Sequence, residues 1–213
     1  MNRYVSSFSR LVGTTIAGFF LICGPALAGG VEQLKTFSDS RLFAEGRFEQ
    51  VVTNPAGAVK QKAKGQFAFS RPGKFRWSIE KPFPQLIVSN GKTVITYDED
   101  LEQASERPLG DAIASSPAAL LFGNEKVDKL FNLKNTETKN GLEWLEATPK
   151  NAETLFDRMR VGMKGGIPVE MEIFDSMGQR TVLQLVDWKL DKAPAASLFS
   201  FTPPPGVDMI RAK

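Results

Sequence analysis

The chain has 213 residues, of which 42% are apolar and 24% are charged, which are ordinary proportions for a folded globular protein. It contains no histidine and one cysteine, Cys23. This excludes Ser-His-Asp triads, Cys-His dyads, histidine-ligated metals and internal disulfides, and with them most hydrolase and metalloenzyme chemistry.

The first 28 residues have the parts of a secretory signal peptide. Arg3 and Arg10 form a basic start, residues 11–22 are an uncharged apolar stretch, and residues 26–28 read Ala-Leu-Ala, a small-x-small cleavage site. The stretch is shorter than the roughly 20 apolar residues that span a bilayer. We predict cleavage after Ala28, and the absence of cysteine beyond it favours the bacterial periplasm.

The remaining residues, 29–213, are predicted to form a single domain. Loss of a leader with two arginines and no acid lowers the formal net charge from +3 to +1. The overall charge therefore gives no evidence for a nucleic acid or an anionic membrane as partner. A chain of about 185 residues is long enough to bury a sizeable core.

The domain begins with a predicted amphipathic helix over residues 31–43. Val31, Leu34, Ser38 and Leu42 recur every three or four positions, with charged residues between them. This spacing places them on one face of the helix.

After Gly46 the period changes from that of a helix to that of a strand. Phe67 and Phe69 alternate with polar or small residues, and residues 75–80 alternate without a fault, which predicts half-buried strands. Pro72-Gly73 between them is a turn signal.

A tight hairpin is predicted next. Residues 86–88 and 94–97 flank Asn90-Gly91, a pair that tolerates the positive φ angles of a tight turn. Further alternating runs cover residues 142–147, 155–163, 169–175 and 181–188. The fold class predicted from these runs is mainly β, with one antiparallel sheet.

Residues 110–133 interrupt this pattern with two short predicted helices. The first has Ser116 as N-cap, Pro117 at its first position and Gly123 as its end. The second is capped by Asn124, and its apolar residues are Val127, Leu130 and Phe131. Because this small amount of helix cannot cover a flat sheet, we expect the sheet to curl around it.

The apolar interior is dominated by phenylalanine. After the leader is removed, Tyr97 is the only tyrosine, beside three tryptophans and many phenylalanines. Phenylalanine brings no polar group that needs a partner. This bias is compatible with an ordinary packed core and with a lipid-sized cavity.

Two polar features of the sequence bear on function. The acidic residues Asp98, Glu99, Asp100 and Glu102 lack the glycine of a calcium loop and fall at a predicted turn, which favours a solvated loop over a metal site. Arg71 shares the parity of Phe67 and Phe69, so it points toward the apolar face. It either reaches out to water at the strand end or hydrogen-bonds the carbonyls of whatever covers the sheet.

Taken together, several segments resemble the periplasmic outer-membrane lipoprotein carrier family, LolA. The resemblance runs in order from about Leu34 to Ile210. It is carried by residues 48–50 (FEQ), 71–77 (RPGKFRW), 84–92 (PQLIVSNGK), 97–103 (YDEDLEQ) and 199–208 (FSFTPPPGVD).

This resemblance implies an incomplete antiparallel β-barrel of roughly eleven strands, a half-barrel with helices forming a lid over an apolar cavity for acyl chains. The family's lid-latching arginine falls on Arg71, and a phenylalanine associated with cargo handling falls on Phe75. The sequence departs from the family in the lid segment, residues 111–131. The implied partners are acylated lipoproteins, an inner-membrane ABC-type release complex driven by ATP and an outer-membrane lipoprotein receptor.

The expected cavity lining combines the front strands, the helical insert and the later strands. Its predicted members are Phe48, Phe67, Phe69, Phe75, Trp77, Ile79, Leu120, Leu121, Met159, Met163, Met171 and Ile173. Flexible methionines suit chains of variable shape. Plain core packing is the competing explanation for each of these residues.

No catalytic residue, metal or cofactor is expected, and a shuttle is simplest as a monomer. Three other functions stay open. They are a periplasmic carrier of free lipids or other hydrophobic small molecules, an interaction module that binds a membrane protein, and a hydrolase with paired carboxylates.

Overall fold

The computed structural model describes residues 28–110, 118–123, 126–151, 154 and 156–211. Residues 1–27 of the predicted leader, the predicted caps Ser116, Pro117 and Asn124, and the predicted strand start at Leu155 lie outside these ranges. Within the described part of the chain, no helix is both long and apolar enough to span a membrane.

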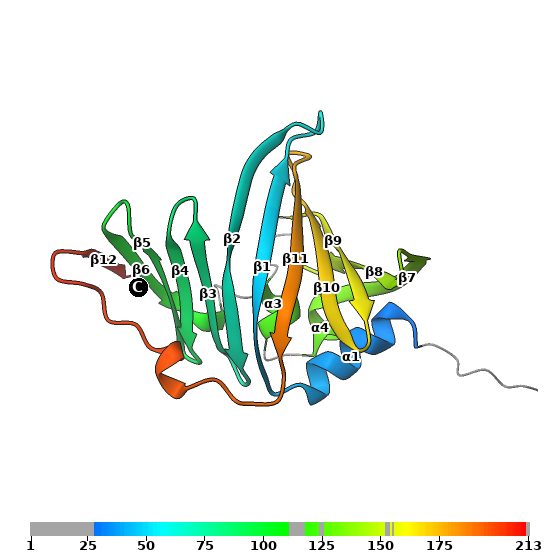
Figure 1. Ribbon diagram of the computed structural model, residues 1–213, viewed down its shortest axis with the longest axis horizontal. Coiled ribbons are helices and arrows are strands. Elements are labelled where there is room, and N and C mark those ends of the chain that lie inside the picture. The colour runs from blue at the N-terminus through cyan, green and yellow to red at the C-terminus, as the bar shows by residue number, and fades with distance from the viewer. Residues whose placement is uncertain (1–27, 111–117, 124–125, 152–153, 155, 212–213) are drawn as a thin grey trace, which may run out of the picture.

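The described residues form one open, curved sheet of twelve strands (Figure 1). The strands are β1 (Phe43–Thr53), β2 (Val59–Ser70), β3 (Lys74–Lys81), β4 (Gln85–Asn90), β5 (Thr93–Asp98), β6 (Gln103–Pro108), β7 (Phe131–Lys139), β8 (Leu142–Pro149), β9 (Arg158–Lys164), β10 (Ile167–Phe174), β11 (Arg180–Lys189) and β12 (Asp208–Arg211). Their order across the sheet is β12-β6-β5-β4-β3-β2-β1-β11-β10-β9-β8-β7. The predicted mainly β class with an unclosed sheet is confirmed.

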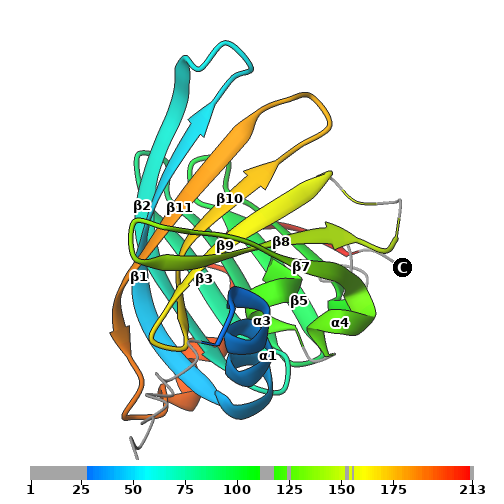
Figure 2. The same cartoon turned by 90° about the vertical axis from the view of Figure 1, so that its right-hand side faces the viewer.

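Helical segments whose bounds lie within the described residues complete the fold. They are α1 (Gly30–Ser40), α3 (Ala118–Phe122), α4 (Val127–Leu130) and the 3₁₀ helix η1 (Ala196–Phe199). Figure 2 shows α1, α3 and α4 on the concave side of the curved sheet. The buried apolar residues of these three helices join those of the concave sheet face in one core.

The Asn90-Gly91 hairpin is confirmed between β4 and β5. Gly91 has a φ of 95°, which a glycine adopts without a Cβ clash. Asn90 contributes through its side chain, because its Oδ1 accepts hydrogen bonds from the backbone N–H groups of Lys92 (2.8 Å) and Thr93 (3.0 Å). The side chain therefore fixes the turn that the backbone of Gly91 permits.

Three predictions about the elements are wrong. The first helix ends at Ser40 and not at residue 43, so Leu42 is exposed outside it and Phe43 begins β1. Phe131 belongs to β7 and not to the second helix, because α4 is one turn that ends at Leu130 and the buried Phe131 and half-buried Leu133 then alternate with exposed residues. The sheet is also not wholly antiparallel. The chain after β11 crosses the outer face at η1 and then runs beside β6, so β12 pairs with β6 in parallel (Figure 1).

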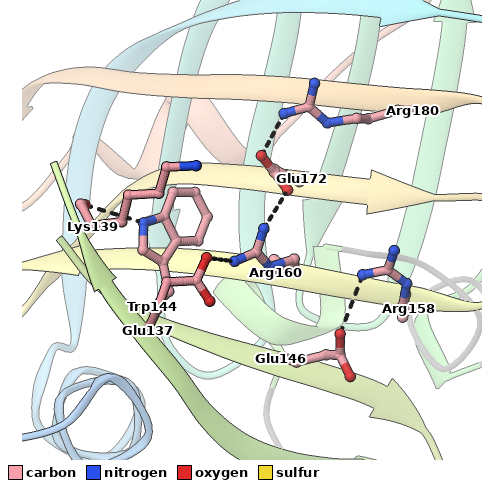
Figure 3. A network of polar contacts seen from close by, with 8 residues as sticks. All are labelled: Glu137, Lys139, Trp144, Glu146, Arg158, Arg160, Glu172 and Arg180. Atoms are coloured by element: carbon pink, nitrogen blue, oxygen red, sulfur yellow. Dashed lines mark hydrogen bonds and ion pairs between the residues drawn. The ribbon is translucent and has the colours of Figure 1, made fainter.

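A ladder of charges ties the strands together on the outer face, between β7 and β11 (Figure 3). Arg160 on β9 bonds Glu137 on β7 and Glu172 on β10, and Glu172 also bonds Arg180 on β11. Arg160 lies 5.0 Å from the ring centre of Trp144. The ladder fixes β7, which is an edge strand with no partner beyond it in the described sheet.

Because carboxylates take part in this ladder, we expect the folded protein to lose stability in acid. The hydrogen bond from Arg160 holds the pKa of Glu137 below its ordinary value. A carboxyl whose pKa is lower in the folded than in the unfolded state stabilises the fold above the unfolded value of about 4.3. That contribution disappears as the pH falls through the lowered pKa. We expect urea unfolding between pH 7 and pH 3 to show a shallower pH slope in Glu137→Gln than in the parent protein, and an equal slope would contradict this role of Glu137.

Asn135 of β7 caps the N-terminus of α1. Its Oδ1 accepts from the Val31 N–H (2.8 Å) and its amide donates to Glu32 (3.1 Å), while the N-cap residue Gly29 has no side chain to do so. We expect Asn135→Ala to cost about 1 kcal/mol of the free energy of unfolding, as lost caps do. A denaturant titration measures this, and an unchanged midpoint would contradict the capping role.

Candidate functional site

The residues predicted to line an apolar cavity come together on the concave side. Phe48, Phe67 and Phe69 lie on β1 and β2 and are buried. All the others belong to the same core or pack against it: Phe75, Trp77 and Ile79 on β3, Leu120 and Leu121 on α3, Met159 and Met163 on β9, and Met171 and Ile173 on β10.

Phe122 of α3 lies at the centre of this cluster and was missed in the sequence. Its ring stacks on that of Phe75 with 5.6 Å between centroids, and lies 5.6 Å from Phe69 and 6.2 Å from both Phe67 and Trp77. In the sequence, the apolar run Leu120-Leu121-Phe122 indicates only that this segment is apolar. Which of the three residues enters the centre depends on how α3 is placed against the sheet.

Among the described residues, Phe122 and the α3 leucines therefore share one buried core with the aromatic side chains of the concave sheet face. A groove of about 460 Å³ lies on the outer face, among polar side chains that include Glu45, Arg47 and Arg76.

Arg71 holds the segment that carries Phe122 through hydrogen bonds to its backbone, a contact that we call the clasp. It directly follows β2, and its guanidinium donates three hydrogen bonds to backbone carbonyls: from Nη1 to Gly123 (2.6 Å), from Nη2 to Leu121 (2.8 Å) and from Nε to Arg41 (3.0 Å). Two of these acceptors flank Phe122 directly. One side chain therefore holds both ends of the residue that fills the site.

The charge of Arg71 is satisfied by dipoles and not by a carboxylate. Burial lowers the pKa of Arg71, and the charge of Asp39 only partly opposes this. No ion pair to Arg71 is found in the described ranges, and its guanidinium carbon lies 5.1 Å from the ring centre of Phe69. Carbonyl acceptors can instead bond water, so such a contact is separable.

Phe75 lies directly beneath the clasped segment. It is a buried residue of β3, paired across the sheet with Phe69 of β2 and Ser89 of β4. Because Phe122 stacks on it, Phe75 belongs to the part of the sheet that α3 covers.

The acidic cluster lies away from this site. Asp98 ends β5, Glu99 and Asp100 are exposed in the following turn, and Asp98 Oδ1 accepts from the Leu101 N–H at 3.2 Å. The predicted solvated turn is confirmed. Over the described ranges, no group of three or more acidic, cysteine or histidine residues is placed to hold a metal ion.

Comparison with known proteins agrees with this arrangement. Residues 42–202 match the family model described as the outer membrane lipoprotein carrier protein LolA. An outer-membrane lipoprotein carrier protein of Bordetella avium is 40% identical over 99% of this chain and 100% of its own length. A protein of the same description from Dechloromonas aromatica is 42% identical over 87% of this chain and 89% of its own.

A solved structure supports the fold independently of sequence. An uncharacterized conserved protein from Thermus thermophilus superimposes with a TM-score of 0.56 at 12% identity, over 85% of this chain and 99% of its own. The family match covers well over half of the chain, and the relatives match it over nearly their whole length. The chain therefore belongs to the LolA family of outer membrane lipoprotein carrier proteins.

Proposed function

We propose that this protein carries outer-membrane-directed lipoproteins through the periplasm and shields their acyl chains on the concave side of the sheet. The relatives described as outer-membrane lipoprotein carriers support this reading. The single observation that carries it is the clasp of Arg71 on both sides of Phe122. A side chain that fills an apolar site and is held by separable bonds suits a site that must be hidden when empty.

The energetics explain why a carrier is needed. Burying a CH₂ group is worth about 0.8 kcal/mol, so one acyl chain of about 16 carbons costs on the order of 12 kcal/mol to expose to water. Such a cost prevents free diffusion of a lipoprotein between membranes. A carrier must offer comparable apolar surface, yet an empty carrier that left this surface open would aggregate.

The proposed cycle follows from the contacts of residues 121–123. In the empty protein, the aromatic cluster is covered by Phe122 and the clasp is closed. During loading, Arg71 releases the Leu121 and Gly123 carbonyls, α3 moves away, and acyl chains replace Phe122 against Phe75, Phe67 and Trp77. The acyl chains then contact side chains that are already apolar, and Phe75 is the proposed cargo-handling contact.

The remaining assignments are part of the same proposal. The leader is cleaved after Ala28, and residues 29–213 act in the periplasm as a monomeric carrier and not as an enzyme. An inner-membrane ATP-driven release complex loads the protein, and an outer-membrane receptor unloads it. The sequence has no nucleotide-binding motif, so the energy for loading has to come from such a partner.

A release assay tests the proposal. Protein purified from the periplasm is added to inner-membrane vesicles that hold a labelled outer-membrane lipoprotein, and the soluble fraction is separated by size-exclusion chromatography. We expect a one-to-one complex that forms only with ATP. The proposal would be contradicted if the unmodified protein, with Arg71 and Phe75 intact, released no lipoprotein from cognate membranes.

The second candidate is a carrier of free lipids. The filled apolar site favours neither cargo by itself, because an acyl chain presents the same CH₂ groups with or without an attached protein. If cognate membranes release no lipoprotein while the purified protein takes up loose phospholipid, the free-lipid carrier replaces the proposed function.

A further inference from the structure

The hairpin of β1 and β2 projects beyond its neighbour on one side. β3 pairs with β2 only from Lys64 to Ser70, so residues 59–63 of β2 pair with β1 alone among the described strands. On the other side, β11 supports β1 up to Thr53. Figure 1 shows this hairpin as the highest point of the molecule, at the end of the sheet opposite α1 and η1.

The tip of this hairpin is apolar and exposed. Residues 55–59 read Pro-Ala-Gly-Ala-Val, and every one of them is exposed. Val59 is 54% exposed, and Met177, in the neighbouring turn between β10 and β11, is 70% exposed. The two turns adjoin, because Pro55 lies against Gly178. They form one exposed tip, and a groove of about 420 Å³ lies behind it, lined by residues that include Val51, Ala63 and Pro82.

A collar of lysines lies directly behind the tip. Lys60, Lys62 and Lys64 are all exposed, and residues 50–66 contain no acid. Lys81 of β3 and Glu49 of β1 both pair with Lys64 in register, and Asp175 lies in the neighbouring turn beside Met177. The hairpin is therefore locally basic, although the overall charge of the chain is close to balance.

From this combination we infer that the β1–β2 hairpin docks the protein on the surface of a bilayer that contains anionic phospholipid. Lysines near such a surface each strengthen binding by about fivefold, and a small apolar tip enters the headgroup region. The contact would be weak and reversible, as a shuttle requires.

Protection of a free strand edge is the competing explanation for the lysines. Lysine on an unpaired strand discourages edge-to-edge pairing. If this were their only role, a variant without these lysines would self-associate, and neither it nor the parent protein would bind lipid vesicles. It also leaves the exposure of Val59 and Met177 without a purpose.

A probe on the tip tests the docking directly. Cys23 is the only cysteine and lies in the predicted leader, so Ala56→Cys in protein purified from the periplasm, with its N-terminus verified by mass spectrometry, carries one environment-sensitive fluorophore. We expect its emission to shift to the blue with vesicles of phosphatidylethanolamine and phosphatidylglycerol, but not with phosphatidylcholine. Raising the salt should reverse the shift. The control is Ala193→Cys, an exposed alanine in the segment between β11 and η1, which should not respond. Figure 1 shows that segment at the opposite end of the sheet.

Matched variants then separate charge from apolar contact. We expect Lys60→Gln, Lys62→Gln and Lys64→Gln together to weaken sedimentation with the anionic vesicles by about 10- to 100-fold. The same change at the exposed Lys126, Lys129 and Lys134 should have a much smaller effect. If the first variant self-associates in size-exclusion chromatography, Val59→Ser with Met177→Ser tests the tip without touching the charges.

Three results would overturn the inference. They are no blue shift at Ala56, equal binding by the hairpin and control variants, or hairpin-dependent binding to a detergent-extracted membrane protein without binding to vesicles. The test uses empty vesicles and no lipoprotein, so its failure leaves the proposed carrier function untouched.

Discussion

Replacing Arg71 by leucine is expected to raise the uptake of an apolar fluorescent probe by the empty protein at least about tenfold. Leucine cannot donate to the Leu121, Gly123 and Arg41 carbonyls that the guanidinium now satisfies. A hydrogen bond to a charged group contributes about 1.5–3 kcal/mol net. The loss of even one such bond shifts the balance between the closed and open site about tenfold.

Arg76→Leu is the matched control for this result. Arg76 lies on the neighbouring strand β3, but it faces the outer groove and donates one long hydrogen bond, of 3.4 Å, to the Leu198 carbonyl. Its loss should leave probe uptake unchanged. Hydrogen exchange of residues 118–123 should rise in the Arg71 variant alone. Normal probe uptake and normal lipoprotein transfer by a folded Arg71→Leu protein would refute the latch role.

Truncating Phe122 to alanine should both destabilise the empty protein and open its site. A buried phenylalanine truncated to alanine costs about 3–5 kcal/mol through lost contacts and the cavity left behind. Here the cavity lies against Phe75, Phe69 and Trp77, which are apolar walls for a ligand. We expect the free energy of unfolding to fall by about 3 kcal/mol, and added fatty acid to restore part of this loss because it binds only the folded state.

Phe199→Ala supplies the comparison for Phe122. Phe199 is also buried, but it belongs to η1 on the outer face and is not part of the concave core. Its truncation should cost a similar free energy of unfolding without any rescue by fatty acid. Equal rescue of both variants would show that the ligand does not occupy the place of Phe122.

The local elements could be predicted because their causes are local. The alternation of residues 75–80 and the Asn90-Gly91 pair predicted β3 and the β4–β5 hairpin, and both are found. The error at Phe131 arose because one apolar residue after a single helical turn fits either period. The parallel β12 has no local signal, because its pairing with β6 depends on the path of the chain across η1.

The sequence by itself determined the mainly β class, the concave apolar residues and the isolated cation beside them. It did so because strand parity fixes which side chains share a face. Only the tertiary structure decided that Phe122 fills the site and that Arg71 bonds the carbonyls on both sides of it. Those contacts join residues about 50 positions apart. Backbone carbonyls occur at every position, so no residue type in the sequence could show which of them the arginine would meet.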